Sequence, residues 1–403
     1  MTSMANLPAM RIIVVTDQYA PMVGGVPAVT RGLAAGLARR GHSVTVLAPS
    51  AGVRGSAAMD GPARVRYLGS VPWPWYPGMR VARVPVRAIR KYISAEAPDV
   101  VHIHSPVVLG VLANWRAGRT GVPVVYTNHY LPANFAGTAG EGSALLRTWF
   151  YAWVVGFANR CGYVTAPSET ALGLLAERGL QAPSRVISNG VDLGKFRPGP
   201  PDPALAGRYG LRLDRPVILS VGRLSPEKRV DVLLDAADRL TGAWQLVIVG
   251  AGPLEAALRA AAAAAAAAAA KGTGRRVTFL GHVPDADLPG IYRLGDVFAI
   301  ASEAELQSLV TMEAMACGLP VVAADAYALS ELVSHGANGY LFARGQSAGL
   351  AACLDALIND ENARLAMGRE SLGVIARHGL ESTLSEWEKV YALITGKYLR
   401  AAA

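Results

Sequence analysis

Short apolar runs of strand length alternate with helix-like segments along this chain, in two series. In the first series the apolar runs are residues 11–16, 44–47, 100–104 and 122–126. Helical patterns lie between them at residues 29–40, which Gly41 would end, and at residues 109–119. Buried strands that alternate with helices predict a parallel sheet with helices on both faces.

The second series follows a Pro- and Gly-rich segment at residues 196–201, which indicates a linker between domains. Its expected strands are residues 217–221, 245–249, 277–280, 297–300 and 321–324. Helices are expected at residues 230–240 and from Pro253 onward. The alanine run Ala260–Ala270 only extends the second helix, because alanine has the highest helix propensity. The chain is therefore predicted to be α/β, with two doubly wound, Rossmann-like domains.

Composition excludes several classes of protein. Hydrophobic residues make up 52% and charged residues 17% of the chain, so it can bury a core and is not intrinsically disordered. No apolar run reaches the roughly 18–20 residues that cross a bilayer, and residues 1–10 lack the pattern of a signal peptide. Three widely spaced cysteines, Cys161, Cys317 and Cys353, form neither a metal motif nor a disulfide framework, which favours a cytoplasmic location.

Charge is unevenly distributed between the two halves. Residues 1–200 hold 20 Lys and Arg against 8 Asp and Glu, while the remainder holds 19 against 22. A basic half suits nucleic acid, anionic lipid or a phosphorylated substrate. The alternative is a well-solvated surface without a partner.

The first cluster of chemically interesting residues is the segment 220–229. It directly follows an expected strand and precedes an expected helix, whose first amides are free to bind an anion. Gly222 would let a ligand approach the backbone. Arg223 and Lys228 place two cations near one point, which suits a diphosphate leaving group. Ordinary surface charge at a helix start is the alternative.

The second cluster contains two glutamates. Glu305 ends the loop after strand 297–300, near a helix start where the amides of residues 308–310 could meet a phosphate. Glu313 lies inside an apolar helix, so we expect it to be largely buried and to need partners. Two ligand hydroxyls would serve, and a buried salt bridge is the alternative.

The third cluster lies in the first half. Gly24 and Gly25 occupy the first strand-to-helix loop, at the sheet edge where α/β proteins bind ligands. His129 follows a strand at the same edge, although a lone histidine is usually structural. His102 and His104 share one strand, and we expect them to point to opposite faces, which argues against a shared metal.

On these motifs the chain resembles the retaining glycosyltransferases of family GT4, which have the GT-B architecture of two Rossmann-like domains and an intervening cleft. The resemblance covers nearly the whole chain. The residues that carry it are Thr16–Gly25, Val100–His104, Thr127–His129, Asn189–Asp192, Gly222–Lys228, and Glu305 to Glu313 with Gly318-Leu-Pro-Val-Val322.

The resemblance implies roles for individual residues. Arg223 and Lys228 would bind the donor diphosphate, Glu313 the ribose hydroxyls, and Glu305 the hydroxyls of the transferred sugar. His129 would contact a sugar hydroxyl. Catalytic roles are thus expected for His129, Arg223, Lys228 and Glu305. The full donor-binding set is expected to be Gly24, Gly25, Gly222, Arg223, Lys228, Val283, Glu305, Gln307, Ser308, Leu309, Val310 and Glu313.

The implied reaction moves a hexose from a nucleotide diphosphate sugar to a hydroxyl with retention. The leaving phosphate would help to deprotonate the acceptor, and no side chain is an obvious nucleophile. The family usually needs no divalent metal, so neither a metal nor a cofactor is expected. The nucleotide sugar is a substrate, and UDP-hexose is the favoured one.

One departure from the family concerns the loop between the glutamates. Many relatives have Glu-x-Phe-Gly there, whereas this chain has Glu305-Leu-Gln307-Ser308. The sequence resembles the variant of glycosyltransferases that act on diacylglycerol. Ser308 replaces the usual glycine, which leaves the position of that loop open.

The resemblance also implies a separate binding function for each domain. Residues 1–197 would bind the acceptor, together with a crossover helix at about 380–403 that returns to this domain. Residues 198–379 would bind the nucleotide sugar. The sequence does not address the oligomeric state.

Aromatic and basic residues of the first half suit contact with an anionic membrane surface. One set is Trp73, Trp75, Tyr76, Arg80, Arg83, Arg87, Arg90 and Lys91, and a second is Trp149, Phe150, Tyr151 and Trp153. A packed aromatic loop under a solvated helix is the alternative. We expect a lipid acceptor such as diacylglycerol or phosphatidylinositol, for a peripheral protein on the inner face of the plasma membrane. The alternative acceptor is soluble: a natural product, an inositol derivative or a polysaccharide.

Two other function classes fit poorly. A nicotinamide-dependent oxidoreductase would need Gly-x-Gly-x-x-Gly after the first strand and an acid about 20 residues on, but only Gly24-Gly25 is present and the second strand is followed by Ala48-Pro49. A nucleic-acid-binding module would leave Glu305 and Glu313 unexplained, so no nucleic-acid partner is expected.

Overall fold

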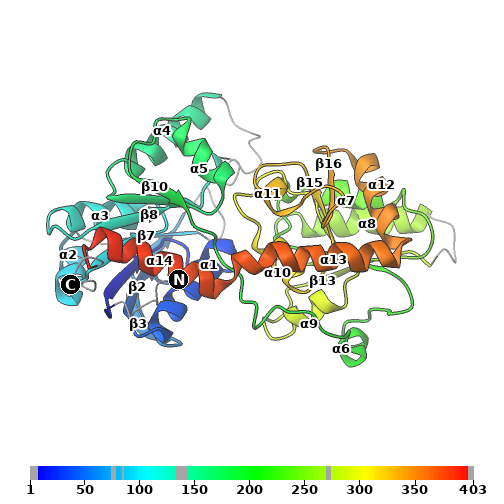
Figure 1. The fold of residues 1–403 in the computed structure, drawn as a ribbon, viewed down its shortest axis with the longest axis horizontal. Coiled ribbons are helices and arrows are strands. Elements are labelled where there is room, and N and C mark those ends of the chain that lie inside the picture. Colours follow the sequence, from blue (N-terminus) through cyan, green and yellow to red (C-terminus); the bar gives the residue numbers. More distant parts are fainter. Residues whose placement is uncertain (1–7, 74–78, 84–85, 133–143, 269–273, 398–403) are drawn as a thin grey trace. The chain divides into compact units, whose positions relative to one another are not determined.

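The computed structural model describes residues 8–73, 79–83, 86–132, 144–268 and 274–397 (Figure 1). The chain divides into two compact units. The first contains Met1–Gly190 and Leu380–Ala403, and the second contains Val191–Gly379. The boundary that we expected after residue 197 therefore lies inside the second unit.

The first unit is built on an eight-stranded sheet with the order β10-β9-β8-β7-β1-β2-β4-β3. Neighbouring strands are parallel, apart from the antiparallel pair β3 and β4. The strands are β1 Arg11–Val15, β2 Ser43–Pro49, β3 Ser56–Asp60, β4 Ala63–Leu68, β7 Val100–Ile103, β8 Val124–Thr127, β9 Tyr163–Ala166 and β10 Ser184–Val186; β5 Ser70–Pro72 and β6 Arg80–Ala82 form a separate ribbon.

Successive side chains of β1 point to opposite faces of this sheet, and each face has its own hydrophobic core. Ile12 and Val14 point to a core that includes residues of α1 and α14, whereas Ile13 and Val15 point to a core beneath α2, α3 and α4. The helices are α1 Gly25–Arg39, α2 Val86–Glu96, α3 Val108–Gly118, α4 Ala144–Ala158, α5 Glu169–Ala176 and α14 Leu380–Ile394.

The second unit contains a six-stranded, all-parallel sheet with the order β13-β12-β11-β14-β15-β16. Counted from the unit's own first strand, this is the Rossmann order 3-2-1-4-5-6. The strands are β11 Val217–Val221, β12 Gln245–Val249, β13 Arg276–Gly281, β14 Val297–Ile300, β15 Val321–Ala324 and β16 Gly339–Phe342. The helices are α6 Pro203–Arg208, α7 Val230–Ala237, α8 Glu255–Ala268, α9 Leu288–Arg293, α10 Leu309–Ala316, α11 Leu329–Leu332, α12 Ser347–Ile358 and α13 Glu361–Ile375, with short 3₁₀ turns at Pro226–Lys228 and Ala376–His378.

The predicted fold class is confirmed, but the sequence did not predict strands β3, β4, β9, β10 and β16, and other elements differ at their ends. Helix α1 starts at Gly25 rather than at residue 29, because Gly24 is its N-cap and Pro27 is tolerated in a first helical turn. Gly41, with φ +93°, follows the end of α1 as expected. Helix α8 includes the alanine run up to Ala268, and the last two alanines lie outside the described residues.

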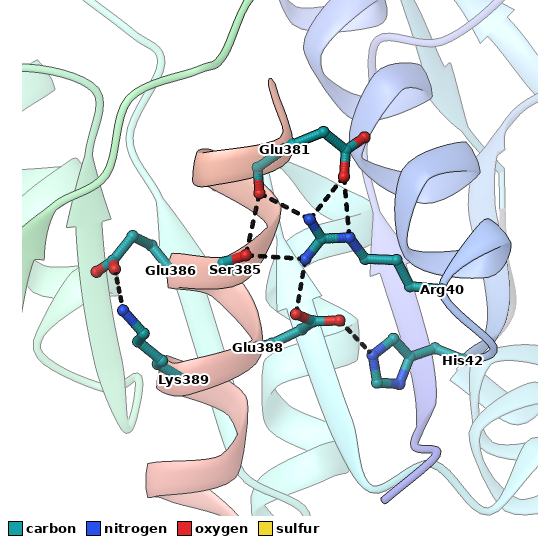
Figure 2. A network of polar contacts seen from close by, with 7 residues as sticks. All are labelled: Arg40, His42, Glu381, Ser385, Glu386, Glu388 and Lys389. Carbon is teal, nitrogen blue, oxygen red and sulfur yellow. Dashed lines mark hydrogen bonds and ion pairs between the residues drawn. The ribbon is translucent and has the colours of Figure 1, made fainter. Parts of the chain in front are cut away.

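The C-terminal helix α14 belongs to the first unit, where Arg40 holds it through a polar network (Figure 2). One guanidinium nitrogen of Arg40 lies 2.6 Å from the Glu381 carboxylate, and another lies 2.7 Å from the Glu388 carboxylate. His42 accepts a hydrogen bond from the amide of Met10 at Nδ1, so its Nε2–H donates to Glu388 at 3.1 Å. These contacts fasten α14 to the end of α1 and the start of β2.

Candidate functional site

The second unit brings two loops together at the point where its strand order reverses. Strands β11 and β14 are neighbours in the sheet, although the chain leaves β11 toward one edge and returns to the other side at β14. In open α/β sheets ligands bind at this switch point, outside the carboxyl ends of the strands. Residues 222–229 and 301–308 follow these two strands, so both sequence clusters of this unit lie at one place.

Two glycines after β12 set the position of the loop that carries Arg223. A Cβ at Gly250, where φ is +127°, would lie 1.9 Å from the carbonyl oxygen of Gly222. A Cβ at Gly252 would lie 2.3 Å from the carbonyl oxygen of Leu224. Only glycine allows this approach of two backbones. Sequence reasoning missed both residues, and a Gly-x-Gly directly after a strand was the signal.

Hydrogen bonds join the two loops. The amide of Glu303 and the hydroxyl of Ser302 both donate to the carbonyl oxygen of Glu227, at 3.0 and 3.3 Å. Arg229 then donates to the Glu303 carboxylate at 2.7 Å. The loops therefore form one framework around the residues between them.

Lys228 and Glu305 meet inside this framework. The Lys228 ammonium donates to the Glu305 carboxylate at 2.5 Å, and the Glu305 side chain is only 10% exposed. Gly222, Arg223, Lys228, Glu305 and Val310 all line one pocket, which is open to solvent. The structure thus places the expected phosphate ligands and the expected sugar ligand together.

Ser308 is the N-cap of helix α10. Its φ of −83° is ordinary for any residue, and its hydroxyl accepts from the amide of Thr311. Glycine is therefore not needed at this position, which answers the question that the departure from Glu-x-Phe-Gly raised. Gln307, Leu309 and Val310 are partly exposed around the cap.

Glu313 lies on α10 and is partly buried. The Tyr292 hydroxyl donates to its carboxylate at 2.7 Å, so the partner is a tyrosine and not the cation of a salt bridge. Burial raises the pKa of Glu313 to about 7, against the lowering effects of Tyr292 and Lys195. Val283, by contrast, is buried in the core of this unit, so its side chain is not available to a ligand.

The expected residues of the first unit lie around the carboxyl ends of β1, β7 and β8. Gly24 caps α1 and, with Gly25, is exposed. His129 is partly exposed, and its Nε2 lies 2.9 Å from Nδ1 of the fully buried His104. The expectation that His102 and His104 face apart is wrong, since residues two apart on a strand share a face and their ring centroids are 4.0 Å apart.

Asp17, like His104, is a buried polar residue at the carboxyl edge of the first sheet. From the sequence alone, no role of its own was expected for it. Its amide donates to the Ser105 hydroxyl at 2.7 Å, and that hydroxyl lies 3.0 Å from its Oδ2. Oδ1 is buried and has no partner among the described residues. Burial raises the pKa of Asp17 to about 7.

Part of the first basic and aromatic set forms contacts within the first unit and is not available to a membrane. Arg80 donates to the Ser50 carbonyl oxygen at 2.9 Å and to the Ser70 hydroxyl at 2.7 Å. Helix α2 buries Ile89 and Ile93 in the core, which leaves Arg90 and Lys91 exposed. Arg83 is exposed and Trp73 is partly exposed. Trp75, Tyr76 and the side chain of Arg87 lie outside what the structure describes.

Helix α4 has an exposed apolar face. Leu145, Leu146, Trp149 and Trp153 are 66%, 64%, 72% and 56% exposed. Their spacing places them along one side of the helix. Arg147 is exposed beside them, and α4 contains no acidic residue. Trp153 still donates to the carbonyl oxygen of Pro106 at 2.9 Å, so one end of this face is fixed.

The described residues contain neither a membrane-spanning helix nor a cluster of metal ligands. No helix there has the length and apolar character needed to cross a membrane. No group of three His, Cys, Asp or Glu side chains in that part of the chain could hold a metal ion.

Solved structures share this pair of Rossmann-like units. Sucrose-phosphate synthase from Thermosynechococcus elongatus matches with a TM-score of 0.78 at 20% identity, over 97% of this chain and 100% of that one. Anabaena HepE in complex with UDP and glucose matches with a TM-score of 0.76 at 22% identity, over 95% and 99% of the two chains. The molecule therefore has the GT-B fold.

Sequence comparisons give the family. The description "Glycosyltransferase Family 4" matches residues 23–195, and "Glycosyl transferases group 1" matches residues 203–372. A GDP-mannose-dependent alpha-mannosyltransferase of Mycolicibacterium smegmatis is 32% identical over 82% of this chain and 84% of its own length. A D-inositol 3-phosphate glycosyltransferase of Mycobacterium bovis is 32% identical over 91% of this chain and 76% of its own. The chain belongs to glycosyltransferase family 4, of the retaining class, and uses a nucleotide sugar.

Proposed function

We propose that this enzyme moves a hexose from a nucleoside diphosphate sugar to a hydroxyl of a membrane lipid, with retention. The observation that supports the donor half is the pocket of Gly222, Arg223, Lys228, Glu305 and Val310 at the switch point of the second sheet. Cations, a carboxylate and the free amides of α10 there are the groups that a diphosphate and a sugar need.

The pairing of Lys228 with Glu305 suggests how the donor binds. In the ligand-free protein the two charges neutralise each other. A bound diphosphate would compete for Lys228 and join Arg223, which leaves Glu305 to accept hydrogen bonds from sugar hydroxyls. During transfer the two cations would stabilise charge on the leaving phosphate, which in turn takes the acceptor proton.

The remaining roles complete the donor site. Glu313 on α10 would accept from the ribose hydroxyls, while the amides of Leu309 and Val310 face phosphate oxygens. As the family resemblance implies, Gly24 and Gly25 would approach the phosphate or the sugar, and His129 would contact a sugar hydroxyl. For the base, uridine remains the prediction from sequence, whereas a relative is named for GDP-mannose.

The lipid acceptor is supported by the exposed face of α4. Two tryptophans and two leucines beside Arg147, without an acidic residue, suit the headgroup level of an anionic bilayer. Contact there would bring the basic first unit to a membrane, where the acceptor hydroxyl lies. The exposed Arg90 and Lys91 of α2 would add electrostatic attraction.

A soluble phosphorylated polyol is the second candidate acceptor. A relative at 32% identity is named for D-inositol 3-phosphate. The same basic charge in the first unit would attract such an acceptor.

A transfer assay tests both parts of the proposal. UDP-, GDP- and ADP-hexoses are supplied with EDTA, either with anionic vesicles that contain diacylglycerol and phosphatidylinositol or with inositol phosphate. We expect turnover that requires vesicles, and loss of about 10²-fold or more in Lys228→Ala. Lys389→Ala, which changes an exposed lysine of α14, is the matched control.

Variants of α4 distinguish a lipid acceptor from a soluble acceptor. Trp149→Ser with Leu145→Ser should abolish vesicle binding and lipid transfer but leave donor hydrolysis unchanged. Leu365→Ser, which changes an exposed leucine of the second unit, is the control for removing apolar surface elsewhere. Transfer to inositol phosphate that is equal in both variants would replace the lipid proposal with the soluble one.

A further inference from the structure

Three histidines of the first unit lie side by side, and one of them is incompletely bonded. His102 is bonded at both nitrogens, to the Tyr391 hydroxyl and to the Thr127 hydroxyl, each at 2.7 Å. His104 is bonded at one nitrogen only, since its Nδ1 lies 2.9 Å from Nε2 of His129. Nε2 of His104 is buried and has no partner among the residues that the structure describes.

The geometry between His104 and His129 is that of a real hydrogen bond. Their ring planes differ by only 11°, and the ring centroids are 5.2 Å apart while the two nitrogens are 2.9 Å apart. The rings therefore lie end to end, and an N–H of one can point at the lone pair of the other. The amide of His104 donates to the Val15 carbonyl oxygen at 2.8 Å, and the His102 ring packs 4.0 Å from the His104 ring. His104 is thus held in place before any ligand arrives.

Both rings are neutral near neutral pH. Burial lowers the pKa of His104 well below its usual value, and lowers the pKa of His129 to about 4. A neutral imidazole has one N–H and one lone pair. The bond between the rings therefore has two possible directions, and each direction fixes where both protons lie.

Nε2 of His104, which has no partner in the described part of the chain, decides between them. If His129 donated from Nε2, His104 would accept at Nδ1 and would leave an N–H at its buried Nε2 without an acceptor. If His104 donates from Nδ1, its buried Nε2 is only a lone pair. Buried N–H groups without a partner are rarer in folded proteins than under-satisfied acceptors. The second direction is therefore the favoured one.

We propose that His104 is a positioning residue which donates from Nδ1 and so holds His129 in the tautomer that carries its proton on Nδ1. His129 then offers a hydrogen-bond donor, and not a base, to a ligand oxygen. That the ligand is the transferred sugar rests on the function proposed above. His129 then cannot take the acceptor proton through Nδ1, which agrees with the proposed transfer of that proton to the leaving phosphate.

Nitrogen-15 NMR of histidine-labelled protein tests the tautomers directly, without any substrate. Two-bond ¹H–¹⁵N correlations distinguish a protonated nitrogen from a bare one, and spectra of His104→Asn and His129→Asn assign the signals. We expect both His104 and His129 to show protonated Nδ1 and bare Nε2. A protonated Nε2 on His129 would overturn the proposal, whether or not the enzyme transfers sugar.

Variants at His104 connect the tautomer to binding. The side-chain amide that His104→Asn introduces can replace the Nδ1 donor, whereas the side chain of His104→Leu cannot. We expect His104→Leu to shift His129 toward protonated Nε2 and to weaken sugar-nucleotide binding about tenfold, with binding of the nucleoside diphosphate unchanged. His104→Asn should restore both. His335→Asn, at an exposed histidine of the second unit, is the control.

The outcomes separate the two proposals. Equal sugar-nucleotide affinity in His104→Leu and wild type, with an unchanged His129 signal, would overturn the role of His104. If the wild type binds no nucleotide sugar, the proposed function fails, and the NMR result alone decides the tautomer.

Discussion

Glu313 is a carboxyl group whose protonation depends on its burial and on the groups around it, Tyr292 first among them. Its burial among the apolar residues of α10 raises its pKa to about 7, while the Tyr292 hydroxyl opposes that rise. Ribose hydroxyls would donate to the ionised form more strongly than to the neutral form. Nucleotide binding and the loss of this proton should therefore be linked.

Glu313 predicts a pH dependence of nucleotide affinity. Because the ligand favours the ionised carboxylate, affinity should rise with pH, by up to about tenfold per pH unit below pH 7, and level off above it. Calorimetry measures the affinity of wild type and of Glu313→Gln for the nucleoside diphosphate at each pH. The ratio of the two affinities isolates the effect of Glu313, because titration of the phosphate changes both affinities equally. Tyr292→Phe should move the rise to higher pH. A ratio that is flat with pH would exclude Glu313 as the titrating group.

Asp17 predicts a pH dependence of stability. Burial raises its pKa in the folded state to about 7, so the folded protein holds this proton over a range in which the unfolded chain has lost it. Stability should therefore fall as pH rises from about 4 to about 7, by about 1.4 kcal/mol per pH unit. Asp17→Asn should remove this fall. Urea unfolding at several pH values measures it, and equal pH slopes for the two proteins would contradict the prediction.

At the scale of elements, the loops at the switch point depend on a third loop after β12. Gly250 and Gly252 let that loop touch the backbone of residues 222–224. The positions of Arg223 and Lys228 are thus fixed by residues that no charge or motif in their own segment reveals.

Gly250→Ala should damage the donor site without touching a ligand. Its Cβ would lie 1.9 Å from the Gly222 carbonyl oxygen, at a φ of +127° that alanine rarely adopts, so the loop must move. We expect a loss of about 1–3 kcal/mol of stability and nucleotide affinity weaker by about tenfold or more. Gly207→Ala in α6, where a Cβ meets nothing within 4 Å, is the control. Unchanged nucleotide affinity in Gly250→Ala would show that this packing does not set the site.

The sequence predicted secondary-structure elements better than it predicted contacts between side chains. Apolar runs predicted β1, β2, β7 and β8, which are half of the first sheet, and every strand of the second sheet except β16, because a buried parallel strand needs continuous apolar sequence. The exposed strand β3 was missed, since it has no buried residue. The Lys228–Glu305 pair and the Tyr292–Glu313 bond could not be derived, because each joins segments far apart in sequence. Ser308 illustrates the same limit: its hydroxyl forms a cap that only the direction of α10 reveals.

At the scale of the whole molecule, the last helix completes the first unit. Helix α14 lies beside α1 and β2 (Figure 1). It places Leu384, Trp387, Val390 and Tyr391 in the core of that unit, together with residues of β1, α1 and β2. Tyr391 also holds His102, which packs on His104. The first unit therefore cannot complete its core until the entire second unit has been synthesised.

Removal of α14 should unfold one unit and spare the other. A chain that ends at Gly379 loses the burial of Leu384, Trp387, Val390 and Tyr391. At about 1.5–3 kcal/mol for each, this loss is comparable with the whole stability of an ordinary domain. Hydrogen exchange with mass spectrometry should show β1 and β2 unprotected, while β11, β12 and β14 stay protected and still respond to nucleoside diphosphate.

Trp387→Ala provides the graded version of this experiment. It should weaken protection in β1 and β2 by about 3–5 kcal/mol of opening free energy and leave the second unit unchanged. Leu365→Ala, on the surface of the second unit, should change neither. If β1 and β2 kept full protection in the chain that ends at Gly379, α14 would be a surface addition to the first unit, and the support of His102 by Tyr391 would have no consequence for the histidine cluster.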